Sequence, residues 1–164
     1  MSETTTRLLR HMSWANQRTY DAVKGLPDLA LGSYIIKPEW TAGRILQHIV
    51  GGADFFVFCL TESPMRERKL PESMTDLNSL QVQLAEFDSK FLSQSELPEE
   101  RITIKENEGS WDALRSTILA QAITHAAEHR TQLIDALESK GFSPISLDEL
   151  DLWRFEGFER EQGS

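Results

Sequence analysis

Two histidines, His125 and His129, lie four residues apart in a stretch of sequence that has the period of a helix. Side chains at positions i and i+4 share one helix face, with their Cβ atoms about 5–6 Å apart. Both imidazoles can therefore bind one ion, at metal–nitrogen distances of about 2.0–2.1 Å if the metal is zinc. His48 is another of the chain's four histidines, and it lies on the apolar face of a second predicted helix. Because facing helices pack about 8–10 Å apart, imidazoles from both helices can converge on one point.

Three imidazoles leave at least one coordination position of a metal ion open. Structural zinc sites are usually closed by four protein ligands, whereas catalytic zinc sites keep a position for water or substrate. Imidazole suits zinc, nickel, copper and iron, so the ligand type alone does not choose the metal. A lone histidine on an apolar face is more often a core residue, and only the combination of three favours a site. We expect a divalent ion, zinc or nickel first, bound by His48, His125 and His129.

Other residues that could do chemistry are not expected to take part in the site. Glu128 directly precedes the second histidine of the pair, so the sequence is not a His-Glu-x-x-His protease motif. A surface contact of Glu128 with Arg130 or Gln132 is favoured over a role as general base, and we assign no residue to that role. Cys59 is predicted to lie in the core. His11 is expected to be exposed or half-buried and not to be a ligand.

The elements that position these side chains are read from hydrophobic period. Long helices are predicted over Thr5–Lys24, from Thr41 to just before Pro64, over Thr75–Ser95 and over Trp111–Lys140. Polar and apolar residues alternate over Arg101–Glu106, which predicts a short extended segment before the last long helix. A short C-terminal helix is predicted over residues 146–155, followed by a frayed tail. The expected fold class is all-α, a four-helix bundle in a single domain over residues 1–164.

Composition argues against several classes of function. The net charge is -9 and no basic stripe is present, so we expect no binding to nucleic acid. A single cysteine excludes an intrachain disulfide framework. We see no N-terminal apolar run typical of a signal peptide and no run of about 20 apolar residues that would span a membrane. These features predict a cytoplasmic protein.

Four stretches, taken in their order and spacing, resemble the DinB/YfiT-like superfamily. The matching segments are Trp14-Ala15-Asn16, Trp40-Thr41 with Leu46-Gln47-His48, Arg101–Ile104 with Gly109, and His125-x-x-x-His129-Arg130-x-Gln132. The chain departs from the common pattern at Glu128, where many members have another histidine, and at Thr131, where glycine is common. These departures leave the three candidate ligands intact and leave the substrate open.

The resemblance implies a four-helix bundle, often dimeric, that holds a divalent ion with three histidines, which by position are His48, His125 and His129. It further implies a metal-dependent enzyme that uses a low-molecular-weight thiol such as mycothiol, bacillithiol or glutathione. The reaction would be S-transfer to a small electrophile or isomerisation. The alternatives are a non-catalytic, stress-associated bundle that binds a metal or ligand, and a structural dimer with fortuitous histidines. A homodimer is expected.

Within the motif, Arg130 follows a ligand directly, so we expect its side chain to point off the metal face and to pair with an acidic neighbour such as Glu128. Trp14 and Trp40 are expected to pack at helix ends and not to line a pocket.

Overall fold

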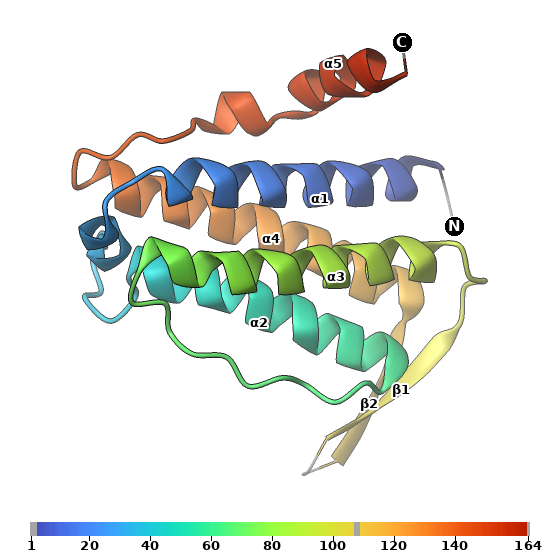
Figure 1. Ribbon diagram of the computed structural model, residues 1–164. Helices are drawn as coiled ribbons and strands as arrows, with labels where there is room; N and C mark the ends of the chain where they lie inside the picture. Colours follow the sequence, from blue (N-terminus) through green and yellow to red (C-terminus); the bar gives the residue numbers. More distant parts are fainter. Residues whose placement is uncertain (1–2, 107–108, 164) are drawn as a thin grey trace.

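Four long helices lie side by side in the computed structural model, which describes residues 3–106 and 109–163 (Figure 1). They are α1 (Glu3–Lys24), α2 (Ala42–Thr61), α3 (Leu77–Ser95) and α4 (Arg115–Glu138). Helix α1 packs against α3 and α4, and α2 packs against the same two helices from the other side. The inward faces of all four helices form one hydrophobic core.

The local sequence fixes where α2 begins and ends. The hydroxyl of Thr41 accepts a hydrogen bond from the backbone N–H of Arg44 at 3.2 Å, as an N-cap residue does. At the other end Glu62 adopts a left-handed conformation, with φ 56°, and its N–H donates to the carbonyl of Phe58. Pro64 follows, so the helix cannot continue.

The predicted extended segment is one half of a β-hairpin. Strand β1 (Arg101–Glu106) pairs antiparallel with β2 (Gly109–Leu114), and Ile104 lies opposite Trp111. The expectations of a purely all-α fold and of a helix starting at Trp111 were therefore wrong. In β2 the side chain of Ala113 is buried between exposed neighbours, which is a strand pattern too short to stand out beside the long helical repeat that follows.

Helix α4 is anchored beneath this hairpin by its first residue, Arg115, which is only 4% exposed. Its guanidinium donates to the carbonyl of Pro98 at 3.1 Å and contacts the side chains of Gln94 and Glu100. Its backbone N–H donates to the carbonyl of Glu100 at 3.0 Å. These contacts fix Arg115 as the first residue of the helix.

The C-terminal helix lies further along the chain than predicted. Residues Leu147–Leu150 form a 3-10 turn and helix α5 covers Leu152–Gln162, so the predicted helix over 146–155 and its frayed tail were wrong, although Ser164 lies outside the described residues. The Asp151 carboxylate caps α5 by accepting from a backbone N–H at 2.7 Å. Such a cap allows a short helix to start after the turn.

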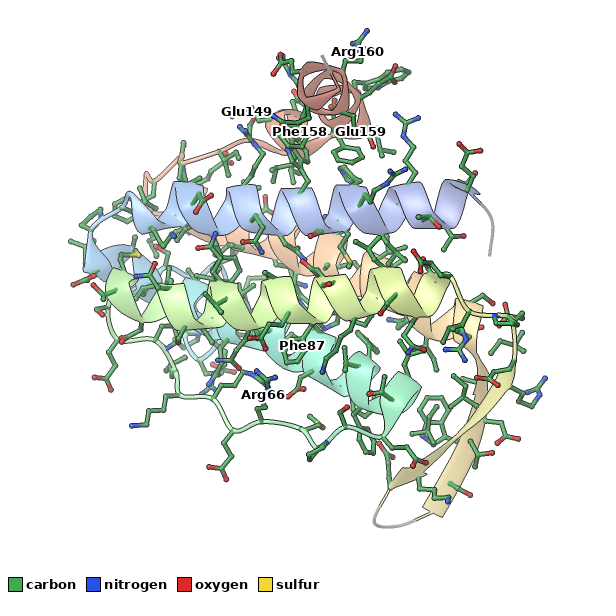
Figure 2. All side chains as sticks on the ribbon, turned by 45° about the vertical axis from the view of Figure 1, so that its right-hand side comes forward. Arg66, Phe87, Glu149, Phe158, Glu159 and Arg160 are labelled. Atoms are coloured by element: carbon green, nitrogen blue, oxygen red, sulfur yellow. The ribbon has the colours of Figure 1, made fainter. Side chains whose placement is uncertain are left out.

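Contacts with α1 hold α5 in place, and the labelled Phe158 and Glu159 lie on its α1 side (Figure 2). The ring of Phe158 lies 6.1 Å from that of Trp14, between centroids. Glu159 pairs with Arg7 at 3.3 Å and lies 3.9 Å from Arg10. Trp14 therefore has a packing role, as predicted, but it lies in the middle of α1 and lines a surface cavity, so the expected place at a helix end, away from any pocket, was wrong.

Helix α2 is the one described helix that is long and apolar enough, by composition, to cross a membrane. Within its apolar window 56% of the helix is buried inside the protein. It packs against both α3 and α4, and a core helix of a soluble protein passes the same test. The expected absence of a membrane partner stays a prediction.

Candidate metal centre

The three predicted histidines meet between α2 and α4. One ring nitrogen from each of His48, His125 and His129 lies within 4.8 Å of the other two. The ring centroids are 4.3 Å apart for the α4 pair, and His48 lies 4.9 Å from His125 and 4.5 Å from His129. Within residues 3–106 and 109–163, no other group of three histidine, cysteine or acidic side chains converges in this way.

The nitrogen spacing fits a small divalent ion. The Nε2 atoms of His48 and His125 are 3.1 Å apart. Two nitrogens bound to one tetrahedral zinc ion, each at about 2.0–2.1 Å, lie about 3.3 Å from one another. These two rings therefore already have the spacing of a chelate.

Gly52 makes room for His125 at this point. It lies one turn after His48 on α2, and a Cβ atom placed on it would come 2.2 Å from Cε1 and 2.7 Å from Nε2 of His125. These separations are shorter than any real contact of a Cβ atom, so a side chain here would force the imidazole away. A glycine within a helix costs about 0.5–1 kcal/mol relative to alanine. Gly52 was not singled out from the sequence, although its place four residues after His48 on one helix face was an available signal.

The orientation of His129 is set by Gln132, one turn later on α4. The Oε1 atom of Gln132 lies 2.9 Å from Nδ1 of His129 and accepts a hydrogen bond from Nε1 of Trp40 at 3.1 Å. An indole nitrogen can only donate, so the amide oxygen of Gln132, and not its nitrogen, faces both partners. The proton of His129 therefore sits on Nδ1, which leaves the Nε2 lone pair free for a metal.

Trp40 also contacts the site through its ring, contrary to the packing role expected at a helix end. The centroid of its ring is 5.1 Å from that of His48 and 5.8 Å from that of His129, both in edge contacts. It lines, with His129 and Gln132, a cavity of about 600 Å³. The other lining residues are Ile35, Ile36, Lys37, Glu39, Ile45 and Ala136.

Burial keeps two of the imidazoles neutral. It lowers the pKa of His125 to about 4, with smaller contributions from His129 and His48. Burial, and then the neighbouring His129, also lowers the pKa of His48. A metal ligand must offer an unprotonated nitrogen. These rings are therefore ready to bind an ion at neutral pH without first losing a proton.

Arg130 does not pair at the surface with Glu128, and that expectation was wrong. Its side chain is buried, and Nη1 donates to Oδ1 of Asn16 at 2.6 Å. The amide nitrogen of Asn16 in turn donates to the two carboxylate oxygens of Asp88, at 3.1 and 3.3 Å. Burial lowers the pKa of Arg130 to about 10 and raises that of Asp88 to about 7. Glu128 itself is exposed.

The other two singled-out residues lie apart from the histidine group. The Nε2 atom of His11 is 2.7 Å from the carbonyl of Leu150, at the contact of α1 with the C-terminal segment. Cys59 is buried in the core as predicted, and burial raises the pKa of its thiol to about 11. Neither is a candidate ligand.

The fold and site define a mainly helical protein in which two of four packed helices bring three histidines together. The chain belongs to the DinB family, whose sequence profile matches residues 1–162, nearly the whole chain. The resemblance noted in the sequence is thereby confirmed. Comparison with curated proteins and with solved structures gives no match.

Proposed function

We propose that His48, His125 and His129 bind one divalent ion, zinc or nickel, and leave a coordination position open to a low-molecular-weight thiol. The observation that carries this proposal is the convergence of three ring nitrogens within 4.8 Å. Membership of the DinB family supports it, and we interpret α1–α4 as the four-helix bundle implied by the resemblance. A homodimer and a cytoplasmic location stay predictions from the sequence.

The chemistry proposed for the site is S-transfer to a small electrophile, or thiol-dependent isomerisation. A divalent ion with an open position would lower the pKa of a thiol and so supply the thiolate, which in S-transfer would bond to the electrophilic carbon as the leaving group departs. The protein's own part is to hold the ligands. Gln132 keeps the His129 proton on Nδ1, and Gly52 lets His125 reach the site. The apolar cavity beside His129 offers space for the electrophile.

A conjugation assay tests this function. Wild-type protein loaded with zinc or nickel is mixed with a bimane electrophile and one thiol. The thiols tested separately are mycothiol, bacillithiol, glutathione and cysteine. We expect metal-dependent formation of one S-conjugate, and its loss in a His125→Ala, His129→Ala double variant. Equal metal content in wild type and double variant would contradict the site. Full metal binding without turnover for any thiol would favour the non-catalytic metal-binding alternative.

A further inference from the structure

A buried polar cluster lies beside the histidines and has no part in the function proposed above. It consists of Asn16 on α1, Asp88 on α3 and Arg130 on α4, which are 2%, 1% and 5% exposed. Asn16 and Arg130 both lie in segments that resemble the family. Burying charged groups in this way is rarely a net gain in stability, because desolvation offsets their attraction. The cluster therefore calls for another explanation.

A small void connects this cluster with the metal centre. Its volume is about 10 Å³, and Asn16, Asp88 and His125 all line it. The rest of its wall is nonpolar, formed by Met12, Ile49, Ala53, Phe56, Leu84, Phe91, Ala122 and Ala126. About 10–15 Å³ measured in this way is the space that one water molecule needs, together with two to four polar partners. The three polar side chains supply those partners.

His125 has one ring nitrogen to spare on the side away from the metal. Its Nε2 faces Nε2 of His48 at 3.1 Å. Within the described part of the chain, no protein atom forms a hydrogen bond with its Nδ1. A histidine that binds a metal almost always donates its second ring N–H to a carboxylate, a carbonyl or a water molecule.

We propose that one water molecule in this void accepts the Nδ1 proton of His125 and donates to Asp88, which makes Asp88 a positioning residue for the metal ligand. Asn16 holds the carboxylate of Asp88 through both oxygens, and Arg130 holds Asn16. The chain of contacts fixes the His125 proton on Nδ1 and directs the Nε2 lone pair toward His48 and the ion. This proposal rests on the proposed metal-binding function.

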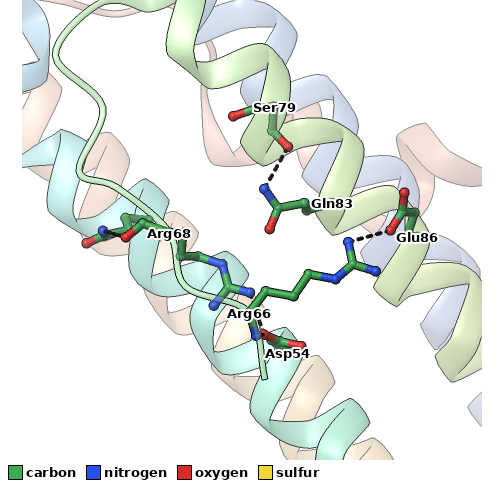
Figure 3. A network of polar contacts seen from close by, with 7 residues as sticks. Asp54, Arg66, Arg68, Ser79, Gln83 and Glu86 are labelled. Atoms are coloured by element: carbon green, nitrogen blue, oxygen red, sulfur yellow. Dashed lines mark hydrogen bonds and ion pairs between the residues drawn. The ribbon is translucent and has the colours of Figure 1, made fainter. Parts of the chain in front are cut away.

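The first test compares two buried aspartates by substitution. Asp88→Asn keeps the shape of the side chain but removes its charge. The matched control is Asp54→Asn: Asp54 is 2% exposed and pairs with Arg68 at 2.5 Å, but it does not line the void (Figure 3). Its Oδ2 also accepts from the backbone N–H of Arg66 at 2.7 Å, so its loss should disturb the fold to a comparable degree.

The readout is the dissociation constant for zinc, measured by competition with a chromophoric chelator at a pH above the Asp88 pKa. We expect Asp88→Asn to weaken zinc binding about 10–100-fold, the range for loss of an outer partner of a ligand. We expect Asp54→Asn to stay within about twofold of wild type. An Asp88→Asn variant that binds zinc as tightly as wild type would overturn the proposal, as would equal losses in both variants.

A second measurement needs no variant and no metal. Nitrogen-15 NMR of the histidine side chains in the metal-free wild type should show His125 protonated on Nδ1, with magnetisation transfer from that proton to a bound water. The proton between the two Nε2 atoms should then belong to His48. A His125 ring protonated on Nε2 would refute the proposal. Failure of the wild type to bind zinc would instead refute the proposed function, so the two failures are distinguishable.

Discussion

Gly52→Ala is expected to abolish tight metal binding without damaging the fold. The added methyl group would lie 2.2 Å from Cε1 of His125, and α2 cannot move away without losing its contacts with α3 and α4. The imidazole must therefore leave its position. Gly51→Ala is a matched control, because a Cβ there meets only Nη1 of Arg68 at 3.8 Å, an ordinary contact. Both variants replace a glycine within the same helix.

The size of the effect follows from the loss of one of three ligands. Changes to outer partners of a ligand already cost 10–100-fold in affinity, so loss of a ligand itself should cost at least about 100-fold. That factor corresponds to about 2.7 kcal/mol. Bound zinc stabilises the folded protein and so raises its melting temperature. In a protein of this size, 1 kcal/mol shifts the melting temperature by about 2–4 °C, so this zinc-induced rise should be about 5–11 °C smaller in Gly52→Ala than in wild type.

Thermal unfolding with and without zinc measures both expectations. Alanine favours helix over glycine by about 0.8–1.0 kcal/mol, so metal-free Gly51→Ala should melt about 2–4 °C above wild type. It should keep the full zinc-induced rise in melting temperature, whereas in Gly52→Ala that rise should be smaller by about 5–11 °C while the protein stays helical by circular dichroism. A Gly52→Ala protein with the zinc response of wild type would refute the role of His125 in the site.

Three further outcomes are expected. Gln132→Leu removes the acceptor for His129 Nδ1 and should weaken zinc binding about 10–100-fold in the chelator assay, with Gln132→Glu close to wild type because it retains an acceptor. Between its ordinary pKa of 3.8 and about 7, Asp88 binds a proton more readily in the folded protein, so stability falls as pH rises through this window. In urea unfolding across that range, the free energy of unfolding of the wild type should fall by up to about 1.4 kcal/mol per pH unit, and that of Asp88→Asn should not. Equal slopes in both proteins would contradict a raised pKa of Asp88. Arg115→Met leaves the carbonyl of Pro98 without its side-chain donor and should cost about 1–3 kcal/mol in urea unfolding, and an unchanged midpoint would contradict the anchoring role.

The convergence of the histidines could be predicted because it depends on two local regularities. Helical period places His125 and His129 on one face, and the apolar neighbours of His48 turn it inward. The structure brings the three together, and their binding of a metal stays a prediction. The positions that support them could not be found in this way. Gln132 lies three residues after His129, which was an available signal, but the partner that fixes its amide is Trp40, distant in sequence.

The errors have a common physical origin in tertiary contacts. Arg130 adjoins a candidate ligand on α4 and was expected to pair with Glu128 on the same helix, but α4 also packs against α1, where Asn16 accepts a hydrogen bond from the guanidinium. Likewise, β2 precedes a long helical repeat, and its strand state depends on pairing with β1. The end of α5 depends on α1 in the same way, through residues such as Glu159. Single-sequence patterns record the period of an element but not the partner that stabilises it.

X-ray absorption spectroscopy of the zinc-loaded protein tests the central claim most directly, because it reports the ligands of the bound ion. We predict one ion per chain with three imidazole nitrogens at about 2.0–2.1 Å and one further light atom. Addition of the cognate thiol should replace that atom with sulfur at about 2.3 Å. A coordination shell without imidazole, or an unchanged spectrum in the His125→Ala, His129→Ala variant, would contradict the account.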